Sequence, residues 1–482
     1  MAMAGLLAVA LGGCVSLAPE QQTPPLPVPE SWSSVSAVTD DASFSARSQP
    51  WRTYFTDPVL QRLIETALAN NRDLRAAVLR VEEARAAFSI QRSERFPVIS
   101  VGGQGARSRV PADFSPTGRQ QVSGEYQAEV GLSSWELDFW GRVRSLEESA
   151  LQSWLATDAA RQAVRLALIG QVADGYLGLR ELDERVESAL QSVITREESY
   201  RIFLRRYQVG ATAKLELMQV QTLLTQAQAL HAQLELARDQ RINAFRQLIG
   251  GDPGTLPRQG PFDETTVLAD LPPGLPSELL TSRPDIIAAE RRLLASNANI
   301  GAARAAFFPR IALTASWGTA SAELDGLFDS GSRAWAFVPT VSLPIFDGGR
   351  RRATLELSEV RRDIAVASYE QTIQTAFREV ADALSARHWL ARQLEVQHTA
   401  RQAQSERARL AQLRYDSGST AYLEVLDAQR DLLDTEQQLI QARRALLSSK
   451  VALYSSLGGD TLPAESPLLI SPTARPASSP TP

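Results

Sequence analysis

The sequence is poor in cysteine and histidine, on which many catalytic and metal sites depend. Of its 482 residues, one is cysteine and three are histidine. A single cysteine excludes an internal disulfide framework and any zinc site built from several cysteines. The histidines show no metal-ligand spacing, and they are His231, His388 and His398.

Catalytic motifs are missing as well. The sequence contains no Gly-x-Ser-x-Gly elbow, no P-loop, no His-Glu-x-x-His pair and no dinucleotide fingerprint after a strand. We therefore predict that the protein is not an enzyme and that it needs no metal or cofactor.

Charge of one sign and long apolar runs are also scarce. The net charge is -5, from 50 basic and 55 acidic residues, so nucleic acid is not an expected partner. After the first residues, no stretch approaches the roughly 18 uninterrupted apolar residues of a membrane helix. If the chain crosses a membrane, we expect it to use strands.

The lone cysteine, Cys14, follows an apolar run and two glycines, in the sequence LLAVALGGCVS. This order is typical of a bacterial lipoprotein signal, and it predicts a signal peptide over residues 1–13 and a lipid on Cys14. The alternative is an ordinary secretory peptide with an incidental cysteine. No Lys or Arg precedes the apolar run, although signal peptides have a basic start; a true start further upstream would explain this.

The chain contains the same pattern twice. RYQVGATAKLELMQVQT at 206–222 matches RYDSGSTAYLEVLDAQR at 414–430, so that equivalent residues lie 208 positions apart. Upstream, Asp73 matches Asp285 at a spacing of 212. We predict two repeats of one unit. The predicted segments are a proline- and serine-rich strap over 14–57, repeats over 58–252 and 277–460, a linker over 253–276 and a disordered tail over 461–482.

Each repeat has one internal plan, in which a helix, two alternating strands and two long helices follow one another. Apolar residues recur at three- and four-residue spacing in the helices and at every second position in the strands. The predicted helices span residues 58–95, 141–209, 213–248, 277–307, 351–415 and 422–457. The strands begin near 98, 122, 311 and 335.

Four strands per chain cannot close a barrel, and open sheet edges are not tolerated in lipid. We therefore expect other copies of the chain to complete a barrel, and the long charged helices to pack as coiled coils in water. The pattern alone leaves another reading open, namely a soluble coiled-coil rod that carries ordinary hairpins.

Four ordered motifs resemble those of a known family. They are SRPDIIAAE at 282–290, FFPRI at 307–311, SLPIFDGGR at 342–350 and YLEVLDAQR at 422–430. Over residues 51–460 the chain resembles the TolC/OprM outer-membrane efflux proteins, in particular their lipid-anchored NodT-type branch. The resemblance implies an α+β membrane protein: a homotrimeric 12-stranded β-barrel, with four strands per chain, that continues into a long α-helical periplasmic barrel.

The resemblance also implies a function. The protein would be the outer-membrane exit duct of a tripartite efflux pump and would conduct small molecules passively. Its partners would be a periplasmic adaptor and an inner-membrane RND-type transporter. Two alternatives stay open, the outer-membrane duct of a type I protein secretion system and a periplasmic coiled-coil scaffold or adaptor.

Gly210 and Gly418 are the first candidate functional residues. Each stands where a long helix must reverse, and glycine accepts the positive φ that such a turn needs. The resemblance implies that these turns contact the adaptor. Tyr207 and Tyr415 lie one helical turn earlier, either to pack the hairpins or to contact the adaptor.

Glu424, Asp427 and Glu216 are the second candidate set. Glu424 and Asp427 are three residues apart and therefore face one side of their helix. The resemblance implies that such acids line the constriction that closes the resting channel, with Glu216 as the equivalent of Glu424 in the first repeat. The alternative is a solvated helix face.

Overall fold

The computed structural model describes residues 17–20, 28–29, 50–254, 271 and 279–459. The predicted signal peptide, the proposed lipid site Cys14, most of the predicted linker and the predicted tail lie outside the described residues.

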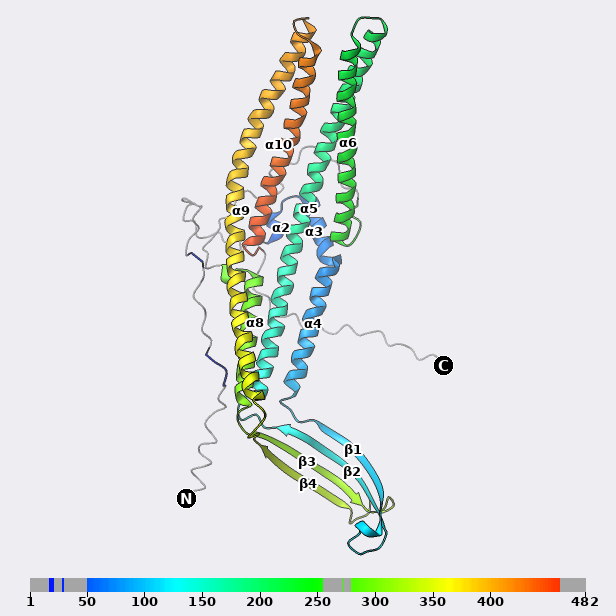
Figure 1. Cartoon of the computed structure of the whole chain (residues 1–482), viewed down its shortest axis with the longest axis vertical. Helices are drawn as coiled ribbons and strands as arrows, with labels where there is room; N and C mark the ends of the chain where they lie inside the picture. Colours follow the sequence, from blue (N-terminus) through cyan, green and yellow to red (C-terminus); the bar gives the residue numbers. More distant parts are fainter. Residues whose placement is uncertain (1–16, 21–27, 30–49, 255–270, 272–278, 460–482) are drawn as a thin grey trace, which may run out of the picture. The chain divides into compact units, whose positions relative to one another are not determined.

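The elements follow one order twice: two helices, two strands and two long helices. Figure 1 shows the long helices and the strands between them. The first series comprises α3 (Pro58–Asn70), α4 (Arg72–Ser93), β1 (Ile99–Val110), β2 (Gln121–Glu136), α5 (Arg142–Gln208) and α6 (Lys214–Ile249). The second comprises α7 (Leu279–Ser282), α8 (Pro284–Ala305), β3 (Arg310–Ser321), β4 (Arg333–Ser342), α9 (Arg350–Asp416) and α10 (Tyr422–Ser456). A short helix, α2 (Trp51–Tyr54), precedes the first series, and the 3-10 turn η2 (Ala112–Phe114) joins β1 to β2. The predicted four strands and paired long helices are confirmed.

The first helix of each repeat was predicted as continuous, and this was wrong. Asn71 divides α3 from α4 because it leaves the helical region. Its side-chain oxygen accepts a hydrogen bond from the Leu74 amide at 2.8 Å, and its side-chain nitrogen donates to the Leu248 carbonyl at 2.8 Å. In the second repeat Arg283 occupies the break, and Pro284 follows at the first position of α8, where proline is tolerated.

The sheet lies in the first of two compact units, which comprises residues 17–20, 79–158 and 288–370 among those described. Its four strands are antiparallel in the order β1-β2-β3-β4 (Figure 1). Trp317 pairs with Trp335 and Ala315 with Phe337, and residues directly opposite in an antiparallel pair share a face. The predicted alternation therefore places these aromatic side chains on one exposed face of the sheet.

β2 contains an irregularity beyond the segment whose alternation was predicted. Its register against β3 shifts between Leu132 and Trp135, and Ser134 between them has a positive φ of 42°. Such a bulge inserts a residue, so that side chains beyond it change face. Trp135 then donates its indole N–H to the Arg95 carbonyl at 3.2 Å.

The second compact unit comprises residues 28–29, 50–78, 159–254, 271, 279–287 and 371–459 of the described chain. Tyr54 and Phe55, which fall within the predicted extended strap, are fully buried in it. Tyr54 stacks on Tyr454 with ring centroids 4.4 Å apart, and its hydroxyl donates to the Lys450 carbonyl at 2.9 Å. The end of the predicted strap is therefore part of the core of this unit.

Among the helices of the described residues, none has a stretch that is both long and apolar enough to span a membrane.

Candidate functional site

The turn between α5 and α6 is fixed by its backbone. Gly210 has a φ of 78°. Its amide donates to the Tyr207 carbonyl at 3.0 Å, and the Ala211 amide donates to the Arg206 carbonyl at 2.7 Å. These two bonds make a Schellman motif, which ends a helix with a residue in the left-handed region.

The turn between α9 and α10 repeats this geometry. Gly418 has a φ of 72°. Its amide donates to the Tyr415 carbonyl at 2.9 Å, and the Ser419 amide donates to the Arg414 carbonyl at 2.9 Å. Gly418 and Gly210 both have open space where a Cβ would stand, so the backbone conformation alone favours glycine at the two turns.

A threonine that precedes the second helix of each hairpin contacts a glutamate in the first turn of that helix. The Thr212 hydroxyl donates to the Glu216 carboxylate, and the Thr420 hydroxyl donates to the Glu424 carboxylate. Both glutamates stand in the first turn of their helix. A negative charge there is favoured by the exposed amides and the helix dipole.

The two predicted tyrosines differ in their surroundings. Tyr415 packs against Tyr422 with ring centroids 4.8 Å apart, and Tyr422 packs against Phe203 at 4.5 Å. Arg206 donates to the Tyr415 hydroxyl, which joins the two hairpins. Tyr207 is 41% exposed, so it is accessible to a partner.

Tyr422 joins the same two hairpins at a second point, and sequence reasoning did not single it out. Its hydroxyl donates to Ser199 at 2.8 Å. Burial raises the pKa of Tyr422, which favours the neutral phenol that donates this bond. Its position four residues after the glycine was visible in the sequence, but its contact with α5 was not.

Two of the three carboxylates of the predicted gate, Glu424 and Asp427, are ion-paired. Arg414 donates to Glu424 at 2.7 Å across the turn, and Arg430 lies 3.4 Å from Asp427. Glu424 and Asp427 are each 42% exposed at the side chain. No ion pair to Glu216 is found in the part of the chain that the structure describes. Sequence reasoning missed the arginines, although Arg430 stands three residues after Asp427 on the same helix face.

The charge pairing continues along α10 at Asp431. This carboxylate accepts from Arg407 at 2.6 Å and from Arg430 at 3.1 Å. The bond from Arg407 holds the pKa of Asp431 below its ordinary value, and Arg430 adds to this effect. Arg430 therefore lies between two carboxylates, Asp427 and Asp431.

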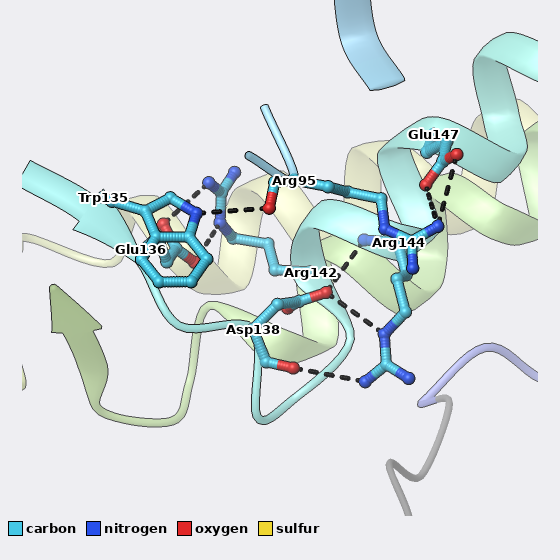
Figure 2. Close-up of polar contacts among 7 residues, drawn as sticks. All are labelled: Arg95, Trp135, Glu136, Asp138, Arg142, Arg144 and Glu147. Carbon is cyan, nitrogen blue, oxygen red and sulfur yellow. Dashed lines mark hydrogen bonds and ion pairs between the residues drawn. The ribbon is translucent and has the colours of Figure 1, made fainter. Parts of the chain in front are cut away.

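A second charged cluster fixes the passage from β2 into α5 within the first unit (Figure 2). Arg142 binds both oxygens of Glu136 at 2.9 and 2.8 Å, and Arg310 reaches the same carboxylate at 2.7 Å. The hydrogen bond to Glu136 raises the pKa of Arg142. Asp138 accepts from the Arg144 amide at 2.9 Å, and these bonds set the direction in which the helix leaves the strand.

Metal-binding groups of three or more His, Cys, Asp or Glu side chains are not found among the described residues.

A family model described as "Outer membrane efflux protein" matches residues 63–251 and 275–459. The chain is 45% identical to outer membrane protein OprJ of Pseudomonas aeruginosa, over 88% of each chain. It is 44% identical to the solvent efflux pump outer membrane protein SrpC of Pseudomonas putida, over 93% of this chain and 96% of that one.

Solved structures match as well. A membrane protein from Pseudomonas aeruginosa superimposes with a TM-score of 0.87 at 43% identity, over 92% of this chain and 100% of that one. The open state of the Neisseria gonorrhoeae MtrE outer membrane channel gives a TM-score of 0.85 at 37% identity, over 92% of this chain and 98% of that one.

Proposed function

The chain belongs to the outer membrane efflux protein family and is the outer-membrane exit duct of an efflux pump, and we propose that it conducts small molecules through a homotrimeric channel closed at its two glycine turns. It has the fold of the family's trimeric channels. The observation that carries the proposal is the four-stranded sheet, in which β1 and β4 each pair with one strand within the chain.

Three chains would supply the twelve strands of a closed barrel. Closure of the barrel gives hydrogen-bond partners to the backbone groups at the outer edges of β1 and β4, and a sheet in lipid requires such partners. The exposed apolar face supports this arrangement, since Trp335 is 76% and Val341 is 66% exposed. A band of such side chains suits the lipid-facing side of a barrel.

We propose that the two turns dock a periplasmic adaptor, which connects the duct to an inner-membrane transporter of the RND type. Gly210 and Gly418 give the turns their shape, and the exposed Tyr207 offers an aromatic contact. Tyr415 has a different role, because it packs between the hairpins. The protein acts as a conduit, and its partners supply the energy.

We propose that Glu424 and Asp427 narrow the channel near these turns, with Glu216 as a weaker counterpart. Their pairing with Arg414 and Arg430 offsets the negative charge of the acids, so that copies of this turn could approach one another in a closed state with less repulsion. Exposed pairs of this kind contribute about 0–1 kcal/mol each, so an adaptor could rearrange them at small energetic cost.

The proposed cargo is a small molecule. Relatives carry names such as solvent efflux pump, toluene efflux pump and antibiotic efflux pump outer membrane proteins. We further propose that Cys14 carries a lipid that anchors the mature chain to the outer membrane, because of the small residues that precede this cysteine.

Accumulation of a fluorescent dye and of antibiotics in a deletion strain tests the function. We expect accumulation to rise on deletion and to fall again when the intact gene is returned. Unchanged accumulation together with loss of a secreted protein from the medium would replace efflux with protein secretion.

A further inference from the structure

Helix α8 carries a glycine that its counterpart helix lacks. Gly301 is buried in the first unit. The equivalent residue of the first repeat, at the upstream spacing of 212, is the exposed Ser89 of α4. Glycine in the middle of a helix is unfavourable relative to alanine, so its presence at this one position needs a reason.

The reason is the approach of the chain's own N-terminal segment. A Cβ at position 301 would lie 2.9 Å from the Ala18 nitrogen and 3.1 Å from the Ala18 Cα. It would also lie 2.8 Å from the Ser145 hydroxyl oxygen. The serine side chain can rotate away, but the backbone of Ala18 can yield only if the segment moves.

A hydrogen bond holds the same segment one turn further along α8. Arg304 donates to the Leu17 carbonyl at 3.3 Å, and its guanidinium also lies 3.9 Å from Glu359 of α9. Leu17 and Ala18 are half-buried, whereas Glu20 is exposed. The close backbone approach at Gly301 and the hydrogen bond from Arg304 to the Leu17 carbonyl together make a notch that receives the backbone of this segment.

We propose that this notch, made by Gly301, Arg304 and Ser145, binds the N-terminal strap of the same chain and sets where its lipid anchor enters the membrane. The inference rests on the proposed lipid at Cys14. Leu17 follows Cys14 by three positions, so the chain between them spans at most about 10 Å. With Leu17 held on α8, the lipid is confined to a short radius around this helix instead of being carried on a long tether.

Thiol labelling tests the notch, because the chain has one native cysteine. Full-length protein in lipid nanodiscs, with Ala18→Cys or Glu20→Cys, is treated with a soluble maleimide. Peptide mass spectrometry then assigns each label to position 14, 18 or 20. We expect the thiol at position 18 to react about tenfold more slowly than the thiol at position 20, and Gly301→Ala to remove this difference by forcing the strap out.

Three further variants separate the possible causes. Ser89→Ala changes the matching position of α4, and the labelling rate at position 18 should not respond to it. Ser145→Ala combined with Gly301→Ala removes the hydroxyl contact, and fast labelling at position 18 should persist if the strap backbone is the obstacle. Arg304→Gln adds no bulk, and it should accelerate labelling at position 18 by a smaller factor.

An equal labelling rate at position 18 with and without Gly301→Ala would overturn the proposed notch. So would a labelling rate that is fast in Gly301→Ala but slow again when Ser145→Ala is added. Labelling of Cys14 itself reports on a different point. It would refute the lipid and with it the anchoring consequence, whereas the rates at position 18 still decide whether the strap docks.

Discussion

The two glycine turns have the same backbone and different side-chain pairings. Both have a left-handed glycine and the same two amide-to-carbonyl bonds. Arg414 pairs with Glu424 of its own hairpin, whereas the equivalent Arg206 reaches Tyr415 of the other hairpin. The helix reversal requires the same backbone conformation at both turns, whereas the side chains around it need not match.

The largest expected effect separates two reasons for a glycine after a helix, which are backbone strain and steric clash. Gly458, which follows α10, has a φ of 94°, and a Cβ there would lie 2.6 Å from the Ser282 carbonyl oxygen. Gly458→Ala should therefore cost about 3 kcal/mol, from backbone strain and from the clash. Thermal unfolding of the detergent-solubilised protein measures this. Gly418→Ala, with open space at its Cβ position, is the control, and an equal loss in both variants contradicts the steric argument.

The next effect tests whether the two turns have the same backbone requirement. Gly210→Ala and Gly418→Ala should each cost about 1–2 kcal/mol, because alanine resists the left-handed conformation. Asparagine at either position should cost less, since it tolerates that region. Unfolding curves for the four variants measure these losses of stability. Clearly different losses in the two alanine variants would show that the turns do not share one backbone requirement.

A smaller effect should distinguish the side chains. Arg414→Ala leaves Glu424 unpaired, and Arg206→Ala leaves no carboxylate unpaired. Each should change stability by about 0.2–1 kcal/mol because these groups are exposed. The loss of stability caused by Arg414→Ala should become smaller as salt is added, because the contact of Arg414 is an ion pair and that of Arg206 is not. Arg414→Ala should also increase the channel's preference for cations, and Arg206→Ala should not. Unfolding and bilayer recordings at low and high salt provide the measurement; a matching salt dependence for Arg206→Ala counts against the assignment.

The smallest effect concerns pH. Asp431 belongs to the second turn region, and its equivalent in the first repeat is Leu223. Because its folded-state pKa is lowered by Arg407, Asp431 stabilises the protein above its unfolded pKa of about 3.9. This stabilisation is lost as pH falls through the folded pKa. Asp431→Asn should therefore be less stable than the parent protein at neutral pH and equally stable in acid. A constant difference across that range would exclude the ion pair as the cause.

The sequence was sufficient for features that depend on local pattern. The repeated Gly210 and Gly418 gave the turns, and alternation gave the strands. Features that depend on partners distant in sequence could not be predicted. Asn71 breaks a helix partly because its side chain meets Leu248, and Glu424 is paired with Arg414 only once the turn brings these two residues together. The reason for a glycine at position 301 of α8 also depends on a residue distant in sequence, Ala18, whose backbone lies against it.

The claim that the second turn carries the gate is tested most directly by single-channel recording in planar bilayers. Glu424→Lys combined with Asp427→Lys is compared with Glu216→Lys and with the unmodified protein. The account predicts that the double variant changes conductance or cation preference more than Glu216→Lys does. Unchanged conductance and selectivity in the double variant, with trimers intact, would contradict it.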